Sequence, residues 1–135
     1  MVYIIGAGPG DPELITVKGQ RLLKEADVII YAGSLVNPAL LDYAKADCEI
    51  YNSASMTLGE VIETITAAEQ EGKMTVRLHT GDPAIYGAIQ EQMDELSRRN
   101  IEYTVIPGVS SFLATAAALK QEYTLPEISQ TVIIT

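Results

Sequence analysis

The sequence has little cysteine, little histidine and no long apolar run. Cys48 is the only cysteine, so no disulfide can form within the chain. His79 is the only histidine, and one Cys with one His cannot supply a zinc site, so we expect no metal site. No apolar run approaches the roughly 20 residues of a membrane span, and residues 1–5 lack the basic region of a signal peptide. These absences predict a cytoplasmic protein with no membrane partner.

Basic residues are scarce as well. Nine Lys and Arg stand against 18 Asp and Glu, which gives a net charge of -9. A nucleic-acid surface needs clustered basic residues to displace counterions, so we expect no nucleic-acid partner. The one adjacent basic pair, Arg98 and Arg99, is typical of a helix C-terminus. An acidic protein accepts a cationic ligand easily, whereas a polyanionic ligand needs local compensation.

The chain does have a regular alternation of short apolar runs with helical stretches. Its 135 residues, 47% of them hydrophobic, suit one domain. We expect five strands at 2–5, 28–31, 49–51, 74–78 and 103–106, and a terminal strand at 131–134. We expect helices at 17–25, 57–71 and 111–119, with a short one ending near 44. This pattern predicts an α/β fold: an open, mostly parallel sheet in three layers, with helices on both faces.

Two helix starts carry recognisable capping signals. Thr57 and Glu60 form a capping box. Asp82 and Pro83 supply an N-cap and a first helical residue. The apolar residues that follow have helical spacing and predict a buried stripe of Ile85, Ile89, Met93 and Leu96.

Small glycine-bearing loops follow four of the expected strands, at 6–12, 32–34, 79–83 and 107–111. Ligands of an open parallel sheet bind outside the carboxyl ends of its strands. Because these ends share one edge, we expect a groove there in which backbone atoms contact a ligand.

The first loop is not a dinucleotide fingerprint. Asp11 stands where the last glycine of that motif belongs and would repel a pyrophosphate, and Tyr31 replaces the acid that binds ribose. His79, at a strand end, suits a structural or loop-bracing role better than catalysis. Cys48 has no basic neighbour in sequence to activate it and is expected to be half-buried and apolar. The catalytic residues are therefore unknown, and a reaction with an already activated donor, such as methyl transfer from a sulfonium, fits this chain.

Three of the loops resemble the signature loops of a known family. Residues 6–12, 80–83 and 107–111 are similar to those of the tetrapyrrole (corrin/porphyrin) methylases. Residues 31–36 and 52–58 resemble the branch that methylates C11 of precorrin-4 in cobalamin biosynthesis. The uroporphyrinogen branch usually has an acid and a glycine at the positions of Ala32 and Thr80.

The resemblance implies a donor, a substrate and a set of contacts. S-adenosyl-L-methionine would be held by Pro9, Thr80, Gly81, Asp82, Ile85, Ser110 and Ser111. The tetrapyrrole substrate would lie near Gly8, Gly10, Asp11 and Ser34. The family has two α/β domains, so we expect residues 1–135 to be the N-terminal domain of a methylase that is a homodimer when full length. Alone, this half should be inactive.

Other interpretations remain open at this stage. Pro9 can serve only to stiffen its turn, and Asp82 and Ser110 can serve only as helix caps. Ile85 can belong to the core stripe. A relative that methylates another ring position and a non-catalytic α/β binding module are the alternative functions. An open groove at the carboxyl edge favours the enzyme, and an edge filled by side chains favours the binding module.

Overall fold

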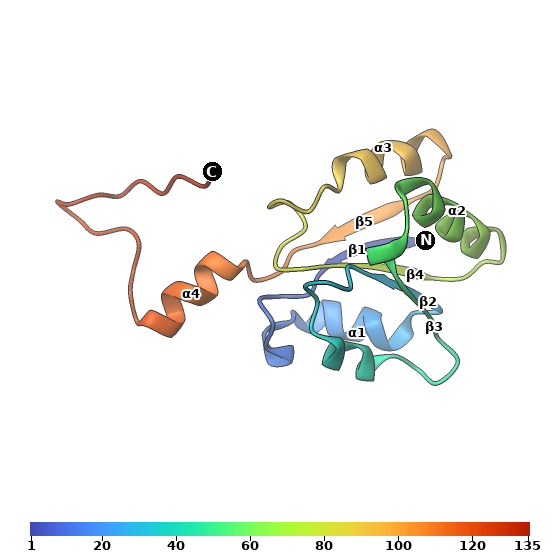
Figure 1. Cartoon of the computed structure of the whole chain (residues 1–135), viewed down its shortest axis with the longest axis horizontal. Helices are drawn as coiled ribbons and strands as arrows, with labels where there is room; N and C mark the ends of the chain where they lie inside the picture. The colour runs from blue at the N-terminus through green and yellow to red at the C-terminus, as the bar shows by residue number, and fades with distance from the viewer.

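The computed structural model describes residues 1–135 as a parallel β-sheet flanked by helices (Figure 1). The strands are β1 (Val2–Gly6), β2 (Val28–Tyr31), β3 (Glu49–Asn52), β4 (Thr75–His79) and β5 (Tyr103–Ile106). The α-helices are α1 (Val17–Glu25), α2 (Leu58–Gln70), α3 (Gln90–Arg98) and α4 (Ser111–Leu119). Short 3₁₀ segments lie at Pro12–Leu14, Pro38–Tyr43 and Ser53–Ser55. None of the helices is both long and apolar enough to cross a membrane.

All strand pairs are parallel, in the order β3-β2-β4-β1-β5. The chain moves outward from β1 to β2 and β3, returns to β4, and then crosses β1 to reach β5. This reversal places a topological switch point between β1 and β4, where Gly6 pairs with His79. The carboxyl ends at such a point form the ligand crevice of open α/β sheets.

Helices cover both faces of the sheet. Helix α1 and the segment Pro38–Tyr43 lie on one face, and α2 and α3 lie on the other (Figure 1). The side chains of β2 alternate between the two cores. Ile29 packs into the core on the α1 side, and Val28 and Ile30 pack into the core on the α2 side. The predicted three-layer α/β fold with both faces buried is confirmed.

The capping box at the start of α2 is also confirmed. The Thr57 hydroxyl accepts a hydrogen bond from the Glu60 backbone N–H at 3.2 Å, and the Glu60 carboxylate accepts one from the Thr57 N–H at 2.7 Å. These reciprocal bonds satisfy backbone donors that the first turn of a helix leaves free.

The predicted helix start at Asp82 and Pro83 is wrong. Residues 83–86 form a turn, residues 87–89 have no regular secondary structure, and α3 begins only at Gln90. Tyr86 and Ala88 have φ values of 55° and 50°, in the left-handed region, which an α-helix cannot contain. Ile85 therefore leaves the predicted stripe and is 37% exposed. The other three members keep their helical face, with Ile89 and Leu96 buried and Met93 half-buried.

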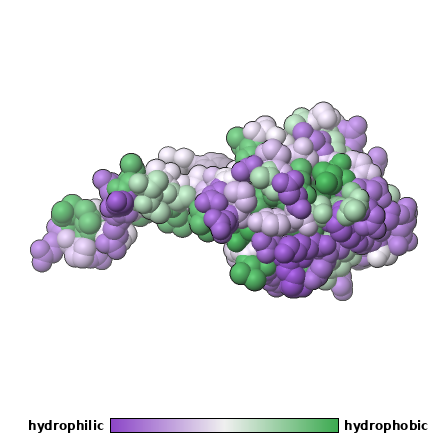
Figure 2. All heavy atoms as spheres, turned by 90° about the horizontal axis from the view of Figure 1, so that it is seen from below, coloured by the Kyte–Doolittle hydropathy of each residue, from purple (hydrophilic) through white to green (hydrophobic).

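The predicted terminal strand at 131–134 is wrong as well. These residues pair with no strand, and Ile133 is 79% exposed. After β5 the chain leaves the sheet through α4, which projects from the body with the residues that follow (Figure 1). An apolar run without a neighbouring strand has no ladder to join. Apolar residues recur along this projecting segment, among them Leu113, Leu119 and Ile128 (Figure 2).

Candidate ligand-binding site

The loops after β1 and β4 are joined by their backbones. Gly8 N–H donates to the Gly81 carbonyl at 3.2 Å, and Gly81 N–H donates to the Gly8 carbonyl at 2.9 Å. One step earlier, Ala7 N–H donates to the His79 carbonyl at 2.6 Å. These bonds continue the β1–β4 pairing past the strand ends and fix both loops at the switch point.

The loop after β5 packs against the same two loops. A Cβ atom at Gly108 would lie 2.2 Å from the Gly81 carbonyl oxygen, and one at Gly6 would lie 2.5 Å from it. Real Cβ contacts are never this short, so only glycine allows the approach. Three of the four glycine-bearing loops that the sequence predicted at one edge, those after β1, β4 and β5, thus meet there.

Asp82 ties two of these loops together. One carboxylate oxygen accepts from Ala84 N–H at 2.8 Å, and the other accepts from Gly108 N–H at 2.9 Å. The capping role expected of Asp82 is therefore present, but it serves a turn instead of a helix. The second bond connects the loop after β4 to the loop after β5.

A cavity of about 390 Å³ opens beside these loops, at the carboxyl ends of β2 and β4. Its wall includes Thr80, Gly81, Asp82, Ile85, Ser110 and Ser111. Ile85 is exposed because its side chain belongs to this wall and not to the core. Ser110 stands at the N-cap of α4, yet its hydroxyl makes no capping bond. All the residues predicted to hold the donor, except Pro9, therefore line one cavity.

Pro9 and the residues predicted for the macrocycle lie on the same edge but outside the cavity wall. Gly8 is buried in the backbone bridge, Pro9 and Gly10 are half-buried, and Asp11 and Ser34 are exposed. The Asp11 carboxylate accepts from Glu13 N–H at 2.9 Å and so caps its own turn.

A side chain from the loop after β2 anchors the first loop. The Asn37 side-chain amide donates to the Gly10 carbonyl at 2.7 Å. The loops after β1 and β2 are thereby connected as well. Whether these loops contact a macrocycle stays a prediction.

Sequence reasoning missed a buried polar group in the cavity wall, formed by Arg77, His79 and Gln92. Arg77 is only 7% exposed. Its Nε donates to Gln92 Oε1 at 3.1 Å, and its Nη1 donates to the Ile30 carbonyl at 3.2 Å. Burial lowers the pKa of the guanidinium to about 10, so it stays charged at neutral pH. The sequence did contain a signal for this group, because Arg77 is a charged residue in the middle of a strand that was expected to be buried.

His79 lies beside Arg77 with its Nε2 atom buried and without a hydrogen-bond partner. Burial, and next the charge of Arg77, lower the pKa of His79 to about 3, although the side chain of Gln92 opposes this shift. The imidazole is thus neutral at pH 7. The backbone carbonyl of His79 accepts from Ala7 N–H, a bond that any residue at this position can make, so the structural role expected of the histidine stays a prediction.

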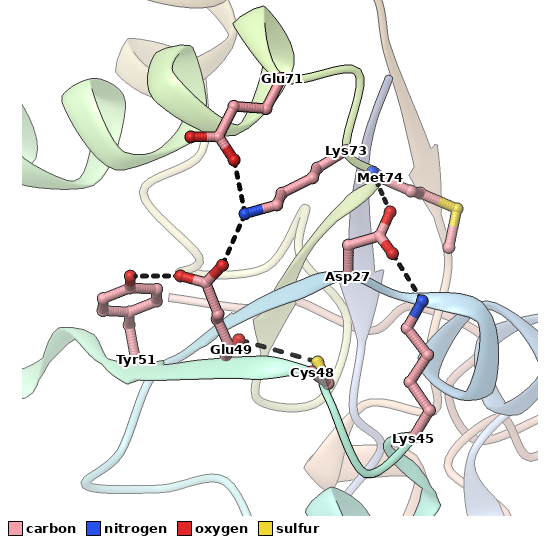
Figure 3. Close-up of polar contacts among 8 residues, drawn as sticks. All are labelled: Asp27, Lys45, Cys48, Glu49, Tyr51, Glu71, Lys73 and Met74. Carbon is pink, nitrogen blue, oxygen red and sulfur yellow. Dashed lines mark hydrogen bonds and ion pairs between the residues drawn. The ribbon is translucent and has the colours of Figure 1, made fainter.

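Cys48 lies at the opposite edge of the sheet, before β3 (Figure 3). It is half-buried, as expected, and burial raises the pKa of its thiol. A thiol with a raised pKa forms little thiolate, which is the nucleophilic form, at neutral pH.

Known proteins resemble this chain over its whole length. The family profile of the Tetrapyrrole (Corrin/Porphyrin) Methylases matches residues 1–135. The cobalt-precorrin-4 C(11)-methyltransferase of Methanocaldococcus jannaschii is 65% identical over 134 residues, which are 99% of this chain and 52% of that relative. The chain therefore spans about half the length of the curated relatives it matches.

Two solved structures share the fold. That of a cobalamin biosynthetic enzyme, cobalt precorrin-4 methyltransferase, superposes with a TM-score of 0.96 at 53% identity, covering 98% of this chain and 55% of its own. That of the uroporphyrin-III C-methyl transferase from Thermus thermophilus, complexed with S-adenosylhomocysteine, has a TM-score of 0.80 at 34% identity, covering 96% of this chain and 52% of its own. With the profile matched along all of its residues, this chain belongs to the tetrapyrrole (corrin/porphyrin) methylases.

Proposed function

We propose that the chain is the first domain of an S-adenosylmethionine-dependent C-methyltransferase that acts on C11 of precorrin-4 or cobalt-precorrin-4. The observation that carries the proposal is the cavity at the carboxyl edge. It gathers Thr80, Gly81, Ser110 and Ser111 from loops far apart in sequence. The binding-module alternative required this edge to be filled by side chains, and the edge is open.

The cavity fits the methyl donor in its chemistry. The bound donor supplies a sulfonium methyl group that needs no activation by a protein acid or base. The close approach of Gly6 and Gly108 to the Gly81 carbonyl leaves no room for side chains at these two positions, so the edge beside the cavity is built from backbone. The Ser110 hydroxyl, free of any capping bond, is available to a ligand. These residues bind and orient, which is the main work of a transfer from an activated donor.

The acceptor assignment follows the relatives. Residues 31–36 and 52–58 resemble the branch that acts on C11, and the relative from Methanocaldococcus jannaschii carries that activity in its name. The uroporphyrin-III enzyme shares the fold at lower identity. The C11 position is therefore favoured over other ring positions.

A second domain and a homodimer complete the proposal. The matched relatives are about twice as long as this chain. The segment from α4 onward exposes large apolar side chains, including Ile128 at 80% and Leu119 at 62%. Exposed apolar surface of this extent is typical of a surface that another part of a protein covers.

Methyl transfer by the full-length protein tests the acceptor. The protein is incubated with ¹³C-methyl-labelled S-adenosylmethionine and, in separate reactions, precorrin-4, cobalt-precorrin-4 or uroporphyrinogen III. Mass spectrometry counts the methyl groups added to the product, and carbon NMR locates them. We expect one labelled methyl group at C11 with at least one of the two forms. Transfer to uroporphyrinogen III alone would overturn the C11 assignment, and transfer to none of the three would overturn the proposal.

Donor binding tests the domain assignment. Titration calorimetry compares S-adenosylhomocysteine binding to the full-length protein and to residues 1–135 alone. We expect clear binding to the former and weak or undetectable binding to the latter, because half of the site is missing. Micromolar affinity for residues 1–135 would contradict the two-domain site.

A further inference from the structure

Arg77 is a buried cation without a carboxylate partner in a strongly acidic chain. The ion pairs of the molecule use other residues, and none of them includes Arg77. Two of its nitrogens bond to neutral oxygens, on Gln92 and Ile30. A buried charge is costly unless a counter-charge or a set of hydrogen bonds compensates it. The folded chain supplies only part of that compensation.

The remaining nitrogen of the guanidinium is accessible. Nη2 makes no hydrogen bond, yet His79 Nε2 is the only fully buried side-chain nitrogen or oxygen without a partner. Nη2 therefore keeps accessible surface, and the two cavities that Arg77 lines are the spaces into which it can open. Arg77 stands in the wall shared by the 390 Å³ cavity and a smaller one of about 190 Å³.

The acids near Arg77 do not neutralise it. Asp82, the one acid in the wall of the larger cavity, uses both of its oxygens on backbone N–H groups. Glu91, in the wall of the smaller cavity, forms no ion pair with Arg77. His79 is neutral at pH 7 and adds no competing charge. A negative group entering the cavity would thus meet a guanidinium that has no ion-pair partner.

We propose that Nη2 of Arg77 donates a hydrogen bond to a carboxylate of the ligand in the 390 Å³ cavity. The inference rests on the proposed function, in which two ligands carry this chemistry: the amino-acid end of the methyl donor and the acid side chains of the macrocycle. Gln92 and the Ile30 carbonyl hold the guanidinium in place, so that its free edge is presented without reorganisation. Arg77 thereby supplies the local positive charge that a polycarboxylate needs on an acidic domain.

Calorimetry on the full-length protein distinguishes the two sources. The probes are S-adenosylhomocysteine, 5′-methylthioadenosine, which lacks the amino-acid carboxylate, and uroporphyrin III, a polycarboxylate tetrapyrrole. We expect Arg77→Gln to weaken binding of one carboxylate probe by about 10- to 100-fold, because a charge-assisted bond is lost, and to leave 5′-methylthioadenosine unchanged. Loss on S-adenosylhomocysteine assigns the donor carboxylate, and loss on uroporphyrin assigns the macrocycle.

Two further variants keep the test decisive. Arg77→Lys retains the charge and should lose less affinity than Arg77→Gln. If Arg77→Gln does not fold, Arg77→Lys replaces it. The proposal is then supported if Arg77→Lys binds uroporphyrin more weakly than the unchanged protein does. It is also supported if Arg77→Lys lowers the affinity for S-adenosylhomocysteine relative to that for 5′-methylthioadenosine. Arg99→Gln is the matched control, because Arg99 lies at the exposed end of α3, away from the cavity. Equal loss on all three probes, or on none, would overturn the inference.

The imidazole of His79 gives an independent signal. In the nitrogen NMR spectrum of histidine-labelled protein, assigned with His79→Gln, a carboxylate bound at Arg77 should shift the His79 resonances. 5′-Methylthioadenosine should shift them less than the probe that depends on Arg77. Equal shifts from all probes would contradict a carboxylate contact. Because none of these readouts requires turnover, failure of the methyl-transfer assay and failure of this inference are separate results.

Discussion

The two ends of the same sheet are built in opposite ways. At the amino end, charged side chains are paired: Lys73 contacts Glu49 and Glu71, and Asp27 contacts Lys45 (Figure 3). At the carboxyl end, backbone meets backbone through glycines. Arg77, which lines the cavity there from the middle of β4, forms no ion pair. Paired charges at an exposed end stabilise only slightly. An unpaired buried cation beside a cavity costs stability, and such costs mark functional sites.

The largest expected effect comes from filling the backbone contact at the carboxyl end. Gly108→Ala would push a Cβ to 2.2 Å from the Gly81 carbonyl oxygen. We expect the free energy of unfolding to fall by about 3 kcal/mol, the upper range of overpacking costs. Urea unfolding measures it. Gly59→Ala is the control, since its Cβ would meet only Thr57 Oγ1 at 3.8 Å. Equal free energies of unfolding for the two variants would contradict tight packing of the backbone at the carboxyl end.

The next effect is a pH dependence that originates at the same end. In the unfolded chain His79 binds a proton below its ordinary pKa of 6.5, whereas the folded imidazole does so only near pH 3. The unfolded state therefore binds more protons between these values, and stability falls as pH falls, at up to about 1.4 kcal/mol per pH unit.

Denaturant unfolding between pH 7 and 4.5 measures this slope, because the carboxylates titrate mostly below that range. His79→Gln should flatten it. An unchanged slope in this variant would assign the pH dependence to other groups and would contradict a lowered pKa of His79 in the folded protein.

The smallest effect belongs to the amino end. The Asp27 carboxylate accepts from Lys45 Nζ at 2.5 Å and from Met74 N–H at 2.7 Å, and these bonds lower its pKa. The stability it contributes is complete above its ordinary pKa of 3.8 and is lost as pH falls below that value. Asp27→Asn should lower the midpoint of thermal unfolding at pH 7 by a few degrees at most.

Measurements in high salt and at low pH test whether the Asp27 ion pair accounts for this small effect. The difference between Asp27→Asn and the unchanged protein should shrink in high salt, because exposed charges are screened, and should disappear at low pH. A loss as large as that of Gly108→Ala would reverse the ranking of the two ends.

The sheet and most of the cavity wall were predictable because local patterns decide them. Apolar runs located β1, β2, β4 and β5, whereas the largely exposed β3 gave only a weak strand signal. Loops at strand ends located Thr80, Gly81, Ser110 and Ser111. These features depend on neighbours in sequence and on the rule that parallel strands share a carboxyl edge.

The remaining features depend on contacts that the sequence does not contain. Helical spacing placed Ile85 in the core, but the left-handed residues Tyr86 and Ala88 rotate the turn and send Ile85 to the cavity. The apolar run at 131–134 has strand propensity but no strand beside it. Arg77 was not recognised because its role follows from the absence of an acid partner in three dimensions.

The mutual hydrogen bonds of Gly8 and Gly81 join main-chain atoms only. The spacing they set does not depend on the side chains that Pro9, Asp11 and Thr80 place around them. Such a frame keeps the distance between the two strands' loops constant when the side chains around it are replaced.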